Sequence, residues 1–191
     1  MKRSALLTVL LIAVVLTVAG CGKKNKYNER VPAPAAEQTE AVDMTQYMPS
    51  LEIQAPAPEI EAPDIAGKNV KLSDFRGKYV VLDFWATWCK DCRAEMPAMK
   101  QLYDKYGPKD VAFVGVSFDT DTQTLMDYGL ENEIPWLVVC NGIKWKENPI
   151  SAAYDIKWIP TLYLIDPEGN VAGINFHAAD MDALLEEVLK N

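Results

Sequence analysis

The sequence contains little histidine and little cysteine. Among its 191 residues there is one histidine, His177, and there are four cysteines: Cys21, Cys89, Cys92 and Cys140. A single histidine excludes histidine-rich metal sites and any chemistry that needs paired histidines. Four cysteines are too few for a small scaffold held together by disulfides, so each cysteine needs its own interpretation.

Basic residues are also in the minority. Nineteen Lys and Arg stand against 27 Asp and Glu, which gives a formal net charge of -8. Proteins that bind nucleic acid need a basic surface, so no nucleic-acid partner is expected. A composition of 49% hydrophobic and 24% charged residues is that of a globular protein rather than of a disordered tail or a fibre.

The N-terminus has the pattern of a targeting segment. Lys2 and Arg3 precede an apolar run over residues 5–19 that only Thr8 and Thr17 interrupt. This run is too short for a membrane-spanning helix and is typical of the hydrophobic region of a signal peptide.

The apolar run leads to Cys21 through small residues, in the order LTVAGC over residues 16–21. This ending resembles the bacterial lipobox. The resemblance implies a signal peptide over residues 1–20, cleavage before Cys21, and a lipid on the Cys21 thiol. The chain would then be held by its lipid at the extracytoplasmic, periplasmic side of a bacterial membrane, where disulfides persist. The alternative is a free or disulfide-bonded Cys21.

A proline-rich stretch follows. Residues 31–63 hold six of the twelve prolines, and Ala and Glu fill much of the rest. This composition disfavours a packed core and is typical of an extended spacer. We therefore predict a lipidated N-terminus and tether over residues 21–61 and a single domain over residues 62–191.

Within the predicted domain, strand and helix patterns alternate. Apolar or alternating runs predict strands, and apolar residues three and four apart predict helices. The strands are expected over residues 69–72, 79–85, 111–118, 136–140, 162–165 and 171–174, and the helices between residues 89 and 106, 122–133, 151–154 and 180–190. This order favours a three-layer α/β sandwich with a parallel portion and a closing hairpin.

Cys89 and Cys92 lie where a buried strand ends and a helix begins. A C-x-x-C pair at such a junction indicates a redox dithiol. Cys89 is expected at the helix start, where free N–H groups favour a thiolate, so it would attack and Cys92 would resolve the mixed disulfide. The alternative is half of a zinc site, for which Cys140 and His177 are the remaining candidate ligands and a second close pair is missing.

Asp83 is a charged residue in the middle of the apolar strand before Cys89. A buried carboxylate is costly unless it has a function, and burial raises its pKa. We expect Asp83 to lie beneath the dithiol and to accept a proton from Cys92 during resolution. The alternative is an Asp on an edge strand, bonded to water.

The segment over residues 83–92, DFWATWCKDC, resembles the active-site segment of thioredoxins, and Pro97 matches a proline of the active-site helix in that family. Residues 158–161, WIPT, resemble its cis-proline loop. The resemblance implies a thioredoxin-like three-layer α/β/α fold and a cis Ile159–Pro160 bond. It also implies that Pro160 packs on the dithiol, and that the Ile159 backbone is free to pair with a bound substrate strand.

Four further segments are similar to the TlpA/ResA group of thiol-disulfide oxidoreductases, which is related to the AhpC/TSA and Redoxin proteins. They are residues 62–78, EMP at 95–97, VSFD at 116–119 and LIDPEG at 164–169. This resemblance implies an N-terminal β-hairpin and an insert before the cis-proline loop. It also implies a tethered reductant of extracytoplasmic protein disulfides, such as those of apocytochrome c, with a DsbD-like or CcdA-like electron donor and no cofactor or metal.

The chain departs from these relatives between its two cysteines, where it has Lys90 and Asp91. The charge of Asp91 disfavours a thiolate, which favours the reducing end of the potential scale, while Lys90 acts the other way. Two alternatives stay open: a disulfide-forming oxidant with the same site, and a non-catalytic lipoprotein that binds metal through the two thiols. Peroxidase activity is not expected, because Ala86 stands where peroxiredoxins carry a threonine.

Four other residues have weaker signals. Cys140 is expected to be an inert buried thiol, with a second redox role as the alternative. His177 is expected at the surface or at a helix cap. Trp85 and Trp88 are expected to wall the site and to contact partner proteins, although Trp85 could equally serve in packing alone.

Overall fold

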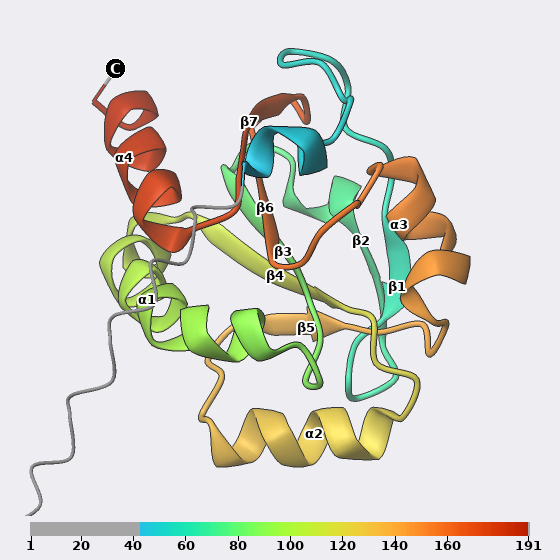
Figure 1. Ribbon diagram of the computed structural model, residues 1–191. Coiled ribbons are helices and arrows are strands. Elements are labelled where there is room, and N and C mark those ends of the chain that lie inside the picture. The colour runs from blue at the N-terminus through green and yellow to red at the C-terminus, as the bar shows by residue number, and fades with distance from the viewer. Residues whose placement is uncertain (1–42, 191) are drawn as a thin grey trace, which may run out of the picture. The chain divides into compact units, whose positions relative to one another are not determined.

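The computed structural model describes residues 43–190, which belong to one compact unit (Figure 1). The predicted signal peptide, Cys21 and the first half of the tether lie outside the described residues. Five strands form the main sheet: β3 (Val80–Trp85), β4 (Ala112–Ser117), β5 (Leu137–Val139), β6 (Thr161–Ile165) and β7 (Val171–Asn175). The helices are α1 (Lys90–Tyr106), α2 (Thr122–Glu131), α3 (Pro149–Ala153) and α4 (Ala178–Val188). A separate hairpin pairs β1 (Glu61–Pro63) with β2 (Asn69–Lys71), as predicted.

The sheet has the order β5-β4-β3-β6-β7. β3, β4 and β5 are parallel, whereas β6 and β7 run antiparallel and form the closing hairpin. β3 lies at the centre, where Asp83 pairs with Gly115 on one side and with Leu162 on the other. The alternative of an edge-strand Asp83 is therefore wrong.

The two faces of β3 meet different helices. Trp85 contacts Tyr128 of α2, with ring centroids 5.7 Å apart, while its neighbour Phe84 contacts Tyr154, which follows α3, at 4.9 Å. Figure 1 shows α1 and α4 together on one side of the sheet and α3 on the other. The predicted three-layer α/β/α sandwich is confirmed.

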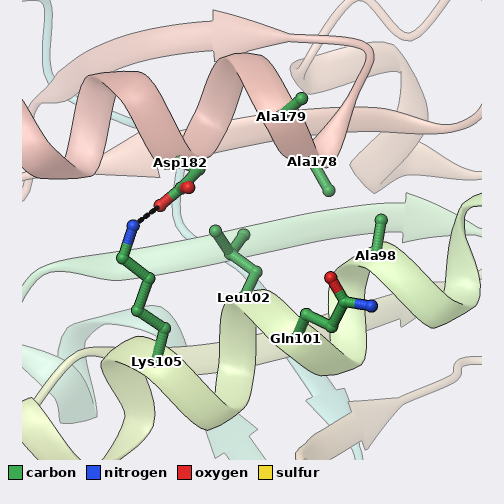
Figure 2. Close-up of a pocket in the computed structure, with 7 residues that line it drawn as sticks. All are labelled: Ala98, Gln101, Leu102, Lys105, Ala178, Ala179 and Asp182. Atoms are coloured by element: carbon green, nitrogen blue, oxygen red, sulfur yellow. Dashed lines mark hydrogen bonds and ion pairs between the residues drawn. The ribbon is translucent and has the colours of Figure 1, made fainter.

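The seam between α1 and α4 combines small apolar contacts with an ion pair. Leu102 of α1 faces Ala178 of α4, and Lys105 Nζ lies 2.6 Å from Asp182 Oδ1 and 2.7 Å from Glu186 Oε1 (Figure 2). These contacts fix α1, which carries the dithiol, against the C-terminal helix.

The helix α1 forms because its apolar residues recur on one face. Cys92, Met96, Met99, Leu102 and Tyr106 are all buried. The helix continues past Pro97 and ends at Gly107, as the Gly107-Pro108 pair predicts.

The folded unit begins earlier than the predicted start at residue 62. The amide of Gln54 donates to the carbonyl of Val171 at 2.8 Å, and the Val171 amide donates to the Ala55 carbonyl at 2.9 Å. Ile60 is 3% exposed within the core. β7 is an edge strand of the sheet, so its outer edge can pair with the backbone of residues 54 and 55, and the proline-rich composition did not reveal this pairing.

Two helix boundaries differ from the predictions by two residues. α2 ends at Glu131 rather than at residue 133, because the chain turns at Glu133 with a φ of 49°. α4 begins at Ala178 rather than at residue 180. None of the helices in residues 43–190 is long and apolar enough to cross a membrane.

Candidate active site

Cys89 and Cys92 form a disulfide at the start of α1, with Cα atoms 5.3 Å apart. Cys89 is the N-cap residue, and the Cys92 amide lies 3.0 Å from its Sγ. Cys89 is 7% exposed and Cys92 is 2% exposed. When the pair is reduced, the helix N-terminus stabilises negative charge on Cys89, the more exposed of the two residues.

The cis-proline loop packs against the dithiol. The Ile159–Pro160 bond is cis, as predicted. The Ile159 carbonyl oxygen lies 3.6 Å from Cys89 Sγ, and Pro160 lines a small cavity together with Cys92. The Ile159 amide has no hydrogen-bond partner within residues 43–190. An unpaired amide beside the reactive sulfur can pair with an incoming extended chain.

Asp83 lies beneath the dithiol and is 4% exposed. It lines the same cavity, of about 10 Å³, as Cys92 and Pro160, a volume that holds at most a single water. Burial raises the pKa of Asp83 from 3.8 to about 7, and the nearby charge of Glu95 adds to the shift. Asp83 can therefore take up or release a proton near neutral pH.

Glu95 and His177 extend this cluster toward the surface. The sequence pattern did not assign a chemical role to Glu95, although Glu95 belongs to the EMP segment at residues 95–97. Its Oε1 lies 3.0 Å from His177 Nδ1, and its Oε2 accepts a hydrogen bond from the Ala178 amide at 3.2 Å. His177 is the exposed N-cap residue of α4, where its side chain makes no cap hydrogen bond. Glu95 thus links the buried Asp83 to an exposed histidine and to the N-terminus of α4.

Asp119 fixes the loop that precedes Cys89. Its side chain is buried and accepts hydrogen bonds from the Thr87 amide at 3.0 Å, from Thr87 Oγ1 at 2.6 Å and from Ser117 Oγ at 2.7 Å. The VSFD motif contained this residue, but nothing in the pattern predicted the partner at position 87. These bonds hold the end of β3 next to the end of β4.

Cys140 is a free, buried thiol that donates a hydrogen bond to the Asp119 carbonyl at 3.1 Å. Burial raises the pKa of Cys140, which disfavours the reactive thiolate. This environment agrees with the expected inert thiol.

The two tryptophans before the dithiol differ in exposure. Trp88 is 54% exposed, whereas Trp85 is completely buried. The expectation that Trp85 contacts partner proteins is wrong, because Trp85 lies on the face of β3 that packs against α2. Trp88 remains the exposed aromatic beside Cys89.

Within the part of the chain that the structure describes, no three His, Cys, Asp or Glu side chains are grouped so as to hold a metal ion. The two close thiols are instead joined to each other. A helix-borne disulfide, a cis-proline against it and a buried carboxyl group beneath it define a thioredoxin-fold thiol-disulfide oxidoreductase.

Comparisons with known proteins agree with this class. Residues 53–174 match the AhpC/TSA family, so the chain belongs to that family. It is 36% identical over 121 residues to the thiol-disulfide oxidoreductase ResA of Bacillus thuringiensis, an alignment that covers 63% of this chain and 68% of that protein. It is 32% identical over 182 residues to ResA of Oceanobacillus iheyensis, an alignment that covers 95% of this chain and 83% of that protein.

Solved structures are similar as well. The thioredoxin domain of a thiol-disulfide oxidoreductase from Bacteroides vulgatus matches with a TM-score of 0.66 and 30% identity, over 73% of this chain and 99% of that one. A thiol:disulfide interchange protein from a Bacteroides species matches with a TM-score of 0.66 and 29% identity, over 74% of this chain and 92% of that one. The enzyme is thus a thiol-disulfide oxidoreductase of the AhpC/TSA family, whose substrates carry thiols or disulfides.

Proposed function

We propose that this enzyme reduces disulfides of extracytoplasmic client proteins while a lipid on Cys21 anchors it to a bacterial membrane. The observation that carries the exchange chemistry is the position of Asp83 beneath Cys92, with its pKa raised to about 7. Such a carboxylate can remove the proton from the less accessible thiol at the moment of resolution.

The proposed reaction has two exchange steps. The Cys89 thiolate attacks one sulfur of the client disulfide, which forms a mixed disulfide and releases the first client sulfur as a thiolate. Asp83 then takes the proton from Cys92. The Cys92 thiolate attacks Cys89 Sγ, and the second client sulfur leaves and is protonated. Two electrons pass to the client, and Cys89 and Cys92 end as the disulfide of the structure.

The proposed client site is the surface around Cys89. Trp88 offers exposed apolar area, and the unpaired Ile159 amide can bond to a client chain in extended conformation. The resemblance to the TlpA/ResA group supports apocytochrome c before haem attachment as one client class. The same resemblance supports a DsbD-like or CcdA-like membrane protein as the source of electrons.

The proposed anchoring rests on the sequence pattern that ends at Cys21 and on the proline-rich stretch that follows. Because residues 43–61 contribute to the folded unit, we propose a tether that is shorter than the predicted span of 21–61. The tether would still hold the domain clear of lipid.

The reduction potential of the Cys89–Cys92 couple tests the proposed direction. We would measure it by equilibration with glutathione in a chain that starts at Asp43. A value at or below that of thioredoxin, about -270 mV, is expected for a reductant. A value close to that of DsbA, about -120 mV, would make the enzyme a disulfide-forming oxidant instead.

A further inference from the structure

Residues 43–50, the N-terminal brace, lie outside the segment that matches the AhpC/TSA family, which begins at residue 53. The brace contains a single 3-10 turn, Met44–Tyr47, that Asp43 caps by accepting a hydrogen bond from the Thr45 amide at 3.0 Å. Pro49 is buried and Tyr47 is half-buried. The brace is therefore a built part of the domain, although its composition predicts a spacer.

Three contacts attach the brace to residues 155–158. The Tyr47 and Trp158 rings lie 5.0 Å apart at an interplanar angle of 44°. The Ser50 amide donates to Asp155 Oδ2 at 2.8 Å. Lys157 Nζ donates to the Met48 carbonyl at 3.1 Å. All three contacts end on the short segment that leads directly into the cis-proline.

This segment borders the reactive sulfur. Trp158 is half-buried and immediately precedes Ile159, whose carbonyl oxygen lies 3.6 Å from Cys89 Sγ. Trp88 immediately precedes Cys89 and is 54% exposed. An aromatic side chain therefore stands next to each of the two chain segments that meet at the dithiol, and the brace extends the second of them with Tyr47.

We propose that the brace and Trp158 form a part of the client-docking surface that continues from the cis-proline loop. This surface takes an extended client segment that presents a large apolar or aromatic side chain next to its reacting cysteine. The inference rests on the proposed function and names the client chemistry for the same site.

The brace and Trp158 offer a client a large apolar surface that is already ordered. Tryptophan and tyrosine give large, stiff contact surfaces, and they are enriched among the residues that dominate binding energy. Met48 adds an adaptable thioether and is 37% exposed. Because Tyr47, Ser50 and Lys157 already hold the brace in place, a client pays little ordering entropy when it binds there.

Tyr47 is a positioning residue in this arrangement. It contacts Trp158 rather than either sulfur, so its removal should alter docking and leave the chemistry unchanged. The expected effect is confined to KM, and to clients whose side chain reaches the aromatic surface.

The test uses the full chain and two synthetic disulfide peptides that differ only in a Phe or a Gly before the cysteine. We expect the wild-type enzyme to have the lower KM for the Phe peptide. Tyr47→Ala should raise that KM about 3- to 10-fold, the value of one aromatic pair, with kcat and the KM of the Gly peptide unchanged. Tyr47→Phe keeps the ring and should behave as wild type. Leu130→Ala removes an apolar side chain that is 77% exposed on α2 and serves as the matched control.

Two further readouts separate docking from a structural effect. The reduction potential of Tyr47→Ala should equal that of the wild type. The variant should remain folded at the assay temperature, although loss of the half-buried ring lowers its melting temperature. An equal rise of KM for both peptides, a shift of the potential, or unchanged constants for both peptides would overturn the inference while the proposed function stands. If the wild-type enzyme reduced neither peptide, the proposed function and this inference would fall together.

Discussion

At the scale of single residues, the buried Asp83 makes the stability of the folded domain depend on pH. Its pKa rises from 3.8 to about 7 because it is buried, with a further contribution from Glu95. Between pH 3.8 and about pH 7, the Asp83 carboxyl group is protonated in the folded state and ionised in the unfolded state. The free energy of unfolding therefore falls as the pH rises through this window, and the loss is complete above the folded pKa.

Asp83→Asn should consequently stabilise the oxidised enzyme at pH 8 by up to about 4 kcal/mol, because an amide carries no charge to bury. At pH 4 the difference should nearly vanish. Denaturant unfolding at both pH values measures the effect, and the same variant should resolve mixed disulfides more slowly. A variant that is less stable than wild type at pH 8 would contradict the assignment of Asp83 as a buried, partly ionised group.

Glu95→Gln should lower the pKa of Asp83, because it removes the negative charge that adds to the effect of burial. This decrease in the pKa of Asp83 should be smaller than the increase that burial causes, since burial is the larger of the two causes. Carbon-13 NMR of the Asp83 carboxyl group over a pH series measures it directly. Glu133→Gln, at a mostly exposed carboxyl group that pairs loosely with Lys100, is the control and should leave Asp83 unchanged.

Replacement of Cys92 and replacement of Cys89 should trap very different amounts of mixed disulfide with a client. Cys92→Ser should accumulate a mixed disulfide between Cys89 and a client, because the resolving thiol is gone. Cys89→Ser should accumulate far less, since Cys92 is 2% exposed and meets clients poorly. Non-reducing mass spectrometry of each variant after incubation with an oxidised protein distinguishes the two. Equal trapping by both variants would refute the assigned order of attack.

At the scale of elements, the active-site loop is held by a partner on the neighbouring strand. Asp119 lies just beyond β4 and accepts both the amide and the hydroxyl of Thr87, so the end of β3 and the start of α1 keep a fixed relation. The dithiol is thus positioned from two directions, by this loop and by the cis-proline loop.

Asp119→Ala should destabilise the fold by about 2–4 kcal/mol, because it leaves buried donors of Thr87 and Ser117 without an acceptor. Thermal and denaturant unfolding measure the loss. Asp127→Ala, which removes an exposed carboxylate on the surface of α2, is the control and should have little effect. Equal stability of Asp119→Ala and wild type would show that the loop does not depend on this carboxylate.

At the scale of the whole molecule, the proposed anchor decides where the enzyme meets its clients. In a bacterial host, Cys21→Ser should abolish incorporation of labelled fatty acid, because the acceptor thiol is missing. Cell fractionation should then show a loss of the mature protein from the membrane fraction. Cys140→Ser, at a buried thiol, is the matched control and should keep the lipid. Unchanged labelling of Cys21→Ser would refute the lipobox interpretation.

Much of the fold was predictable because the signals are local. The apolar run over β3, the periodic face of α1 and the turn before β7 each depend on residues within a few positions of one another, and each was confirmed. The helix ends were less predictable, since α2 and α4 end or begin where caps compete with the periodic pattern.

The sequence by itself determined the dithiol, its place at the start of a helix, the succession of strands and helices along the chain and, through resemblance, the cis bond before Pro160. The sequence also predicted Asp83 and Pro160 beside the dithiol, but only the tertiary structure decided which distant side chains hold the site in place. Thr87 and Asp119 are 32 positions apart, Glu95 and His177 are 82 apart, and Met48 and Lys157 are 109 apart. Periodicity and turn chemistry act over a few residues, whereas these pairs meet because the sheet and its helices pack in one particular way.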